Sequence, residues 1–182
     1  MGTIIVDPSS EIPETDLSRT SLSSRVRKGK NNDDMQFVEF MLGHEYFAVN
    51  LFHTREVITP TEITPLPNTP AYIRGVMDLR GSITTIIDLK ILLNLTDEIE
   101  QKKRSRIIIL DQEASEKPVG ILVDDVYSVS THHADDIDRN AEDEIHTIRN
   151  ILGVIRKNVK DGHKLILWLD IQAIRASIEK DL

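Results

Sequence analysis

The second half of this sequence repeats the pattern of the first half, and this repetition limits the possible folds more than any other feature. Three pairs of segments align: FAVNLFHTREV with VGILVDDVYSV, IRGV with ILGV, and TIIDLKIL with LWLDIQAI. The offset between the paired segments grows from 72 to 78 to 82 residues, and it grows only between segments. Because insertions collect in loops, the sequence predicts two copies of one structural unit with unequal connections.

Each copy consists of short apolar runs that have the length of β-strands. These runs span residues 37–42, 46–51, 73–79, 82–88, 106–110, 119–126, 151–156 and 164–169. Four prolines between Thr59 and Pro70 remove backbone donors, so we expect an extended crossing segment there. The pairs Arg80-Gly81 and Asp161-Gly162 predict tight hairpins between the last two strands of each copy.

The last strand of each copy ends in an aspartate, Asp88 or Asp170, and a helical pattern follows it. A carboxylate at this position can cap the free N–H groups of a helix and oppose the helix dipole. Ile171, Ile174 and Ile178 then fall on one face, which predicts a C-terminal helix packed on the sheets.

The strands are apolar on both sides, and each copy alone is too short to bury a large core. We therefore expect the two copies to share one core. Trp168, within the run LILWL, has no polar alternation around it and is predicted to be a core residue.

The composition excludes several classes of protein. The chain has no cysteine, which fits a reducing compartment and rules out disulfides and cysteine-ligated metals. A net charge of −8 argues against general binding to nucleic acid or anionic lipid. No run of about 18 apolar residues occurs, so we expect a cytosolic protein without direct membrane insertion. Residues 1–34 are predicted to form a disordered leader, followed by a folded domain over 35–182.

One group of residues is a candidate for metal or acid–base chemistry. His132-His133 and Asp124-Asp125 carry the imidazole and carboxylate groups that hydrolytic metal sites use, so a small metal-dependent hydrolase is one alternative. However, adjacent histidines on a strand point to opposite faces, and a solvated connector is the favoured interpretation. Asp124 and Asp125 are better explained as turn and capping residues. The common phosphate-binding, nucleophile and zinc motifs are absent, so we predict no catalytic, metal-binding or cofactor-binding residues.

The segment TPAYIRGVMDLRGSITTIIDLKILL at 69–93 resembles the central signature of CheW-like chemotaxis coupling domains. Three further stretches resemble the family at the right spacings: FVEFMLGHEYFAVNL with REVI, VGILVDDVYSV, and ILGV with LILWLDI. The resemblance covers residues 35–175. It implies an all-β fold of two intertwined SH3-like five-stranded barrels with short helices and a C-terminal helix.

The resemblance also implies a function. Family members are non-enzymatic scaffolds that couple the cytoplasmic tip of a chemoreceptor (a methyl-accepting chemotaxis protein) to the regulatory domain of the histidine kinase CheA. Such a protein would lie in the cytoplasm at receptor arrays on the inner face of the membrane, with other CheW-like domains as further partners. An alternative is a CheW-like module for a non-chemotactic kinase array or a polar localisation system.

Particular residues follow from the resemblance, motif by motif. The receptor helix would lie in an apolar groove between the barrels, at Thr54, Ile83, Val126 and Val129. Glu56 and Arg80 match a family salt bridge that positions the receptor-facing surface, and a guanidinium can hold a carboxylate by two hydrogen bonds. Without the resemblance, Arg80 would be an ordinary hairpin-turn arginine. Asp78 stands where the family usually has Asn and could compete with Glu56 for Arg80, and Thr54 replaces an aliphatic residue.

Overall fold

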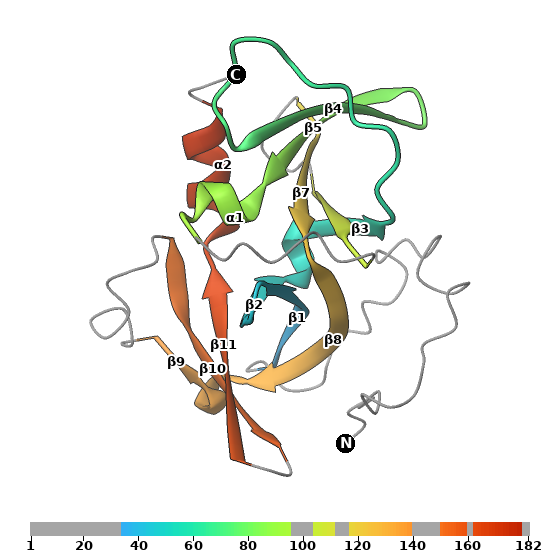
Figure 1. The fold of residues 1–182 in the computed structure, drawn as a ribbon. Helices are drawn as coiled ribbons and strands as arrows, with labels where there is room; N and C mark the ends of the chain where they lie inside the picture. Colours follow the sequence, from blue (N-terminus) through green and yellow to red (C-terminus); the bar gives the residue numbers. More distant parts are fainter. Residues whose placement is uncertain (1–33, 96–103, 112–116, 140–149, 160–161, 180–182) are drawn as a thin grey trace.

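The computed structural model describes residues 34–95, 104–111, 117–139, 150–159 and 162–179 (Figure 1). Its first half contains β1 (Asp34–Leu42), β2 (Glu45–Asn50), η2 (Leu51–His53), β3 (Thr54–Ile58), β4 (Ile73–Leu79), β5 (Ser82–Asp88) and α1 (Leu89–Leu92). Its second half contains β6 (Arg106–Leu110), β7 (Val119–Val123), β8 (Asp125–His133), η3 (Ala134–Asp136), β9 (Ile137–Asp138), β10 (Ile151–Val159), β11 (Gly162–Leu169) and α2 (Ile171–Ile178). The predicted leader lies outside the described residues except for Asp34, which begins β1 one residue before the predicted domain.

The strands form two sheets, and each sheet takes strands from both halves of the chain. Sheet 1 has the order β3-β6-β7-β5-β4, and sheet 2 has the order β8-β1-β2-β11-β10-β9. Strands β6 and β7 therefore complete sheet 1, whereas β1 and β2 complete sheet 2. The parallel pairs β5–β7 and β2–β11 occupy equivalent places in the two sheets. This exchange confirms the predicted all-β, intertwined fold, and the two-residue β9 adds a sixth strand to sheet 2.

Equivalent glycines mark the repeat at the level of the backbone. The β4–β5 ladder shifts register at Gly75, and the β10–β11 ladder shifts at Gly153. A Cβ atom on Gly75 would lie 2.1 Å from the carbonyl oxygen of Thr64, and one on Gly153 would lie 2.8 Å from that of Asp138. At both places a crossing segment passes too close for a side chain, so only glycine fits.

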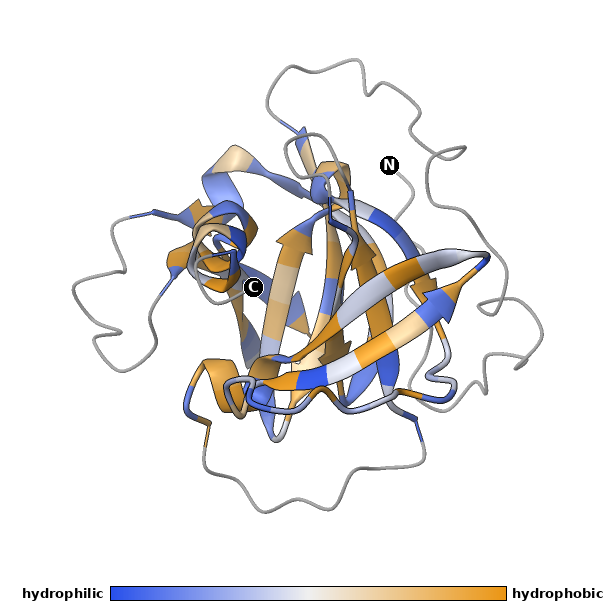
Figure 2. Ribbon diagram, turned by 90° about the horizontal axis from the view of Figure 1, so that it is seen from above, coloured by the Kyte–Doolittle hydropathy of each residue, from blue (hydrophilic) through white to orange (hydrophobic). Residues whose placement is uncertain are grey.

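The largest of three buried apolar clusters joins the two sheets, which confirms the predicted shared core. Strands of both sheets and helix α2 contribute to one buried apolar cluster, in which Ile171, Ile174 and Ile178 are at most 2% exposed. Trp168 is buried in an adjoining cluster, and its ring meets Phe37 edge-on with 5.2 Å between ring centroids. Figure 2 shows long hydrophobic stretches along the strands that form this interior.

The structure corrects two predictions in the second half. The apolar run 119–126 is not one strand, because it breaks at Asp124 and β8 then continues to His133. His132 lies in β8 and is only 7% exposed, so the prediction of a solvated connector is wrong for His132, whereas the side chain of the neighbouring His133 is 58% exposed.

The two predicted hairpin turns have different outcomes. Arg80 and Gly81 form the two-residue loop between β4 and β5, both with positive φ, which confirms that turn. In the second hairpin Gly162 pairs with Val159 and already belongs to β11, and residues 160–161 between them lie outside the described residues.

Candidate functional site

The tip of the β4–β5 hairpin holds an arginine in an unusual backbone conformation. Arg80 has a φ of 54° and Gly81 has a φ of 83°, so both residues are left-handed. Such a conformation costs a residue with a side chain about 1–2 kcal/mol. The turn is supported by Asp78, whose Oδ1 accepts a hydrogen bond of 2.6 Å from the backbone N–H of Gly81. The chain thus keeps a large cation where glycine would be easier to accommodate.

Arg80 forms a two-pronged ion pair with Glu56 on strand β3. The guanidinium donates to the two carboxylate oxygens over 3.0 and 3.4 Å. Glu56 is only 4% exposed, whereas the side chain of Arg80 is 65% exposed. Because β3 and β4 are the two edge strands of sheet 1, the pair connects the β4–β5 turn to the opposite edge of the sheet. The Glu56–Arg80 pair that the family resemblance implied is therefore present. The carboxylate of Asp78 instead accepts the hydrogen bond from the N–H of Gly81 in the turn.

The ion pair borders a small pocket of about 100 Å³. Its walls come from β3, from the β4–β5 hairpin, and from Ile109 and Leu110 of β6. Sites for small molecules usually enclose about 300–1,000 Å³, so this pocket is too small to hold one.

The four predicted groove residues divide into an exposed pair and a buried pair. Ile83 on β5 and Val129 on β8 are 62% and 44% exposed. Thr54 and Val126 are each only 6% exposed, so the structure does not present them at the surface as the groove prediction required. Ile83 belongs to sheet 1 and Val129 to sheet 2, and a partner that covers both must lie across the two sheets.

The candidate metal ligands are directed to separate partners. Nε2 of His132 lies 2.7 Å from Oε1 of Glu39, and Nδ1 of His133 lies 3.0 Å from Oδ1 of Asp34. Asp124 instead pairs with Lys90 at 2.8 Å. Over the ranges that the structure describes, no group of three or more histidine and carboxylate side chains is arranged to hold a metal ion.

Glu39 is the centre of a buried polar network that the sequence analysis missed. It is fully buried on β1, and Nζ of Lys157 on β10 lies 2.9 Å from its Oε2. The hydroxyl of Ser130 also contacts its Oε1. Burial raises the pKa of Glu39, but hydrogen bonds from His132, Ser130 and Lys157 outweigh it and lower the pKa to about 2. A single carboxylate inside the apolar run FVEFML was the available signal, because a charge there needs buried partners.

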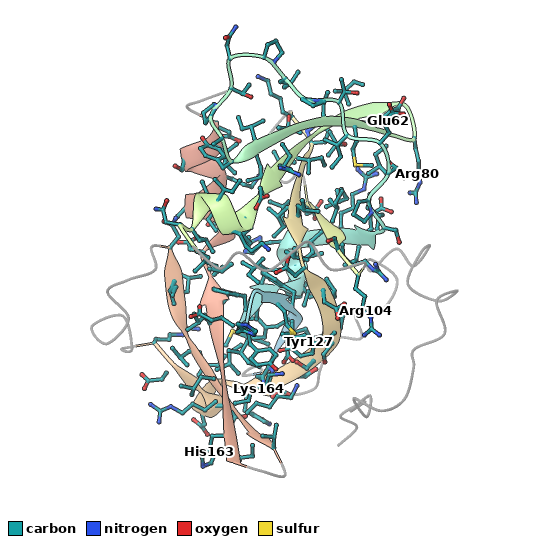
Figure 3. All side chains as sticks on the ribbon, viewed as in Figure 1. Glu62, Arg80, Arg104, Tyr127, His163 and Lys164 are labelled. Atoms are coloured by element: carbon teal, nitrogen blue, oxygen red, sulfur yellow. The ribbon has the colours of Figure 1, made fainter. Side chains whose placement is uncertain are left out.

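A second lysine lies beside this network, between two tyrosine rings. Nζ of Lys164 is 3.3 Å from the ring centroid of Tyr46 and 4.1 Å from that of Tyr127. Figure 3 shows Tyr127 and Lys164 side by side in sheet 2, on the opposite half of the molecule from Arg80. Burial lowers the pKa of Lys164 to about 8, with Lys157 adding to the effect and Glu39 opposing it. Burial and the charge of Glu39 raise the pKa of Tyr127, which keeps its phenol neutral.

The structure consists of two intertwined sheets, and each sheet presents an exposed apolar side chain, Ile83 or Val129. Together with the bidentate ion pair of Arg80 and Glu56, these features are typical of a protein-binding module. Among the described residues, no helix is long and apolar enough to cross a membrane. The family model described as "CheW-like domain" matches residues 36–179. The chain therefore belongs to the CheW-like domain family.

Individual relatives carry the same name. The chain is 35% identical over 104 residues to the "Probable chemotaxis protein CheW" of Rhizobium etli, which covers 57% of this chain and 65% of that protein, just under two thirds. It is 27% identical over 161 residues to the "Chemotaxis protein CheW" of Treponema pallidum, covering 85% of this chain and 90% of that protein. The crystal structure of "scaffolding protein TtCheW" from Thermoanaerobacter tengcongensis matches with a TM-score of 0.66 and 28% identity, over 78% of this chain and 88% of that one.

Proposed function

We propose that this chain is a cytoplasmic, non-enzymatic coupling protein that binds the cytoplasmic tip of a chemoreceptor and the regulatory domain of the kinase CheA. The proposal is supported by membership of the CheW-like family and by the scaffolding role named for the structural neighbour. The observation that carries it is the pair of exposed apolar side chains, Ile83 and Val129, one from each sheet. A chemoreceptor tip is a helical hairpin, and a helix can bury its apolar stripe against such a pair.

In this proposal Arg80 orders the sheet 1 side of the docking surface. Its ion pair with the buried Glu56 holds the β4–β5 hairpin against β3, and Ile83 follows that turn within two residues of Gly81. Both oxygens of Glu56 are used, so a single flexible ammonium would hold the hairpin less firmly than the guanidinium does. The exposed part of Arg80 remains available to a carboxylate of the partner.

The departures from the family signature do not favour another pathway. Asp78 accepts a hydrogen bond from the N–H of Gly81, which an asparagine side chain can also do. Thr54 is buried and donates its hydroxyl proton to the carbonyl of Asn50 at 3.4 Å, so it does not present a polar group to the surface. The chemotaxis reading is therefore preferred over a non-chemotactic array or a polar localisation system.

Direct binding of a purified receptor-tip fragment to the full chain tests the docking surface. We expect Ile83→Asp to weaken binding at least tenfold, because a charge would be buried against the partner's apolar stripe. Leu165→Asp is the matched control, since Leu165 is 57% exposed on β11, which β1 and β2 separate from β8 in sheet 2, whereas β5 belongs to sheet 1. Equal affinities of the two variants would contradict the proposed surface.

A second comparison tests Arg80. Arg80→Ala should weaken receptor binding by about three- to thirtyfold and leave the domain folded, because the guanidinium is mostly exposed. The receptor affinity of Arg80→Lys should lie between those of Arg80→Ala and the unaltered protein. Lysine keeps the positive charge but cannot hold Glu56 by two parallel hydrogen bonds as a guanidinium does. Unchanged binding by Arg80→Ala would remove Arg80 from the site.

A further inference from the structure

The chain passes from sheet 1 to sheet 2 through a single residue. Strand β7 ends at Val123 and β8 begins at Asp125, which leaves only Asp124 between them. The other direct crossing, from β2 to β3, uses the three residues of η2. Since a one-residue connection has few backbone angles to vary, the conformation of Asp124 governs how the two sheets meet.

Asp124 is held from three directions. Its Oδ1 pairs with Nζ of Lys90 at 2.8 Å, and its Oδ2 accepts a hydrogen bond of 2.6 Å from the N–H of Gly43. Its own N–H donates to the carbonyl of Met41 over 3.1 Å. The side chains of Asp124 and Lys90 are only 11% and 15% exposed, so solvent screens the pair weakly.

These contacts connect the two sheets. Lys90 lies on α1, which directly follows β5, and β5 carries Ile83 in sheet 1. Gly43 lies in the turn between β1 and β2 of sheet 2. Asp124 itself leads into β8, which carries Val129. One carboxylate therefore joins the strand beneath one exposed apolar residue to the strand beneath the other.

Capping alone does not require this arrangement. The hydrogen bond to the N–H of Gly43 already caps the β1–β2 turn through Oδ2 of Asp124. Lys90 instead extends from a helix of the opposite sheet to a carboxylate that is almost buried. Removal of either partner would leave a largely buried charge without compensation, so the pair resists being separated when the two sheets move.

We propose that the Lys90–Asp124 pair is a hinge clamp that fixes the angle between the two sheets and thereby the spacing of Ile83 and Val129. Asp124 is then a positioning residue for receptor docking, and this role rests on the proposed function. The clamp itself is a property of the free protein and is measurable without any partner.

The spacing of the sheets can be measured by double electron–electron resonance. The chain contains no cysteine, so Thr64→Cys and Asn158→Cys provide a single pair of spin-label sites without further changes. Thr64 is exposed and its backbone is bonded to β4 of sheet 1, and Asn158 is exposed on β10 of sheet 2. In this background, Lys90→Met removes the charge of the clamp and Lys90→Arg retains it.

We expect Lys90→Met to broaden or shift the distance distribution, and Lys90→Arg to restore the distribution of the parent. Receptor-tip binding should weaken about two- to thirtyfold in Lys90→Met and recover in Lys90→Arg. An unchanged distribution in folded Lys90→Met would overturn the clamp, even if affinity fell, because Lys90 would then act by contact. A changed distribution in a protein that binds no receptor tip would support the clamp and refute the docking function instead.

Discussion

The buried network around Glu39 should make the stability of this domain depend on pH in a defined window. In the unfolded chain Glu39 titrates near its ordinary value of 4.5, whereas in the folded protein its pKa is lowered to about 2. The folded state therefore binds its proton less readily than the unfolded state does. A carboxylate with a lowered pKa stabilises the fold above pH 4.5, and this contribution is lost as the pH falls towards 2.

The size of the effect follows from these two values. The difference between 4.5 and about 2 corresponds to about 3 kcal/mol, because one pKa unit is worth about 1.4 kcal/mol. Most of it, about 2 kcal/mol, should already be lost at pH 3. Glu39→Gln removes the titrating group and leaves Lys157 without its carboxylate, which should cost about 3 kcal/mol at pH 7.

Urea unfolding of the unaltered protein and of Glu39→Gln at pH 7 and pH 3 measures this contribution. Other carboxylates titrate in both proteins, so their effects cancel in the difference between the two free energies of unfolding. That difference should shrink by about 2 kcal/mol between pH 7 and pH 3. A difference that stays constant over this range would refute the assignment of a low pKa to Glu39.

Two further predictions concern the repeated backbone features. Gly75→Ala should destabilise the domain by more than about 3 kcal/mol in urea unfolding, because its Cβ would lie 2.1 Å from the carbonyl oxygen of Thr64 at a φ of 140°. Gly81→Ala, with open space around its Cβ, should cost only about 1 kcal/mol, and equal costs would argue against the clash. Asp170→Ala should cost about 1 kcal/mol by removing the 2.9 Å hydrogen bond to the N–H of Ala173, and an unchanged free energy of unfolding would show that this cap is dispensable.

The fold was largely predictable because its determinants repeat along the chain. Apolar runs with a growing offset indicated two copies, and the aspartates at the strand ends indicated the two helices. Asp88 and Asp170 do cap α1 and α2 with their side chains. The exchange of strands between the sheets depends on contacts distant in sequence, and it came only from the family resemblance.

The polar sites were harder to predict, because their meaning depends on partners far away in the chain. Glu39 and His132 are 93 residues apart, and neither position alone signals a buried pair. The run 119–126 was predicted to be one strand although Asp124 and Asp125 were interpreted as turn and capping residues, and no glycine or proline marks where β7 gives way to β8. In contrast, Arg80 and Glu56 were paired through the resemblance, and the structure brings them together.

Co-sedimentation tests most directly whether this chain couples a receptor to a kinase. Membranes containing a cognate chemoreceptor are mixed with CheA and with the full chain, and the kinase in the pellet is quantified. The account predicts that CheA sediments efficiently only when the chain is present, that Ile83→Asp reduces its recovery severalfold, and that Leu165→Asp retains receptor binding. Equal recovery of CheA with and without the chain would contradict the coupling function.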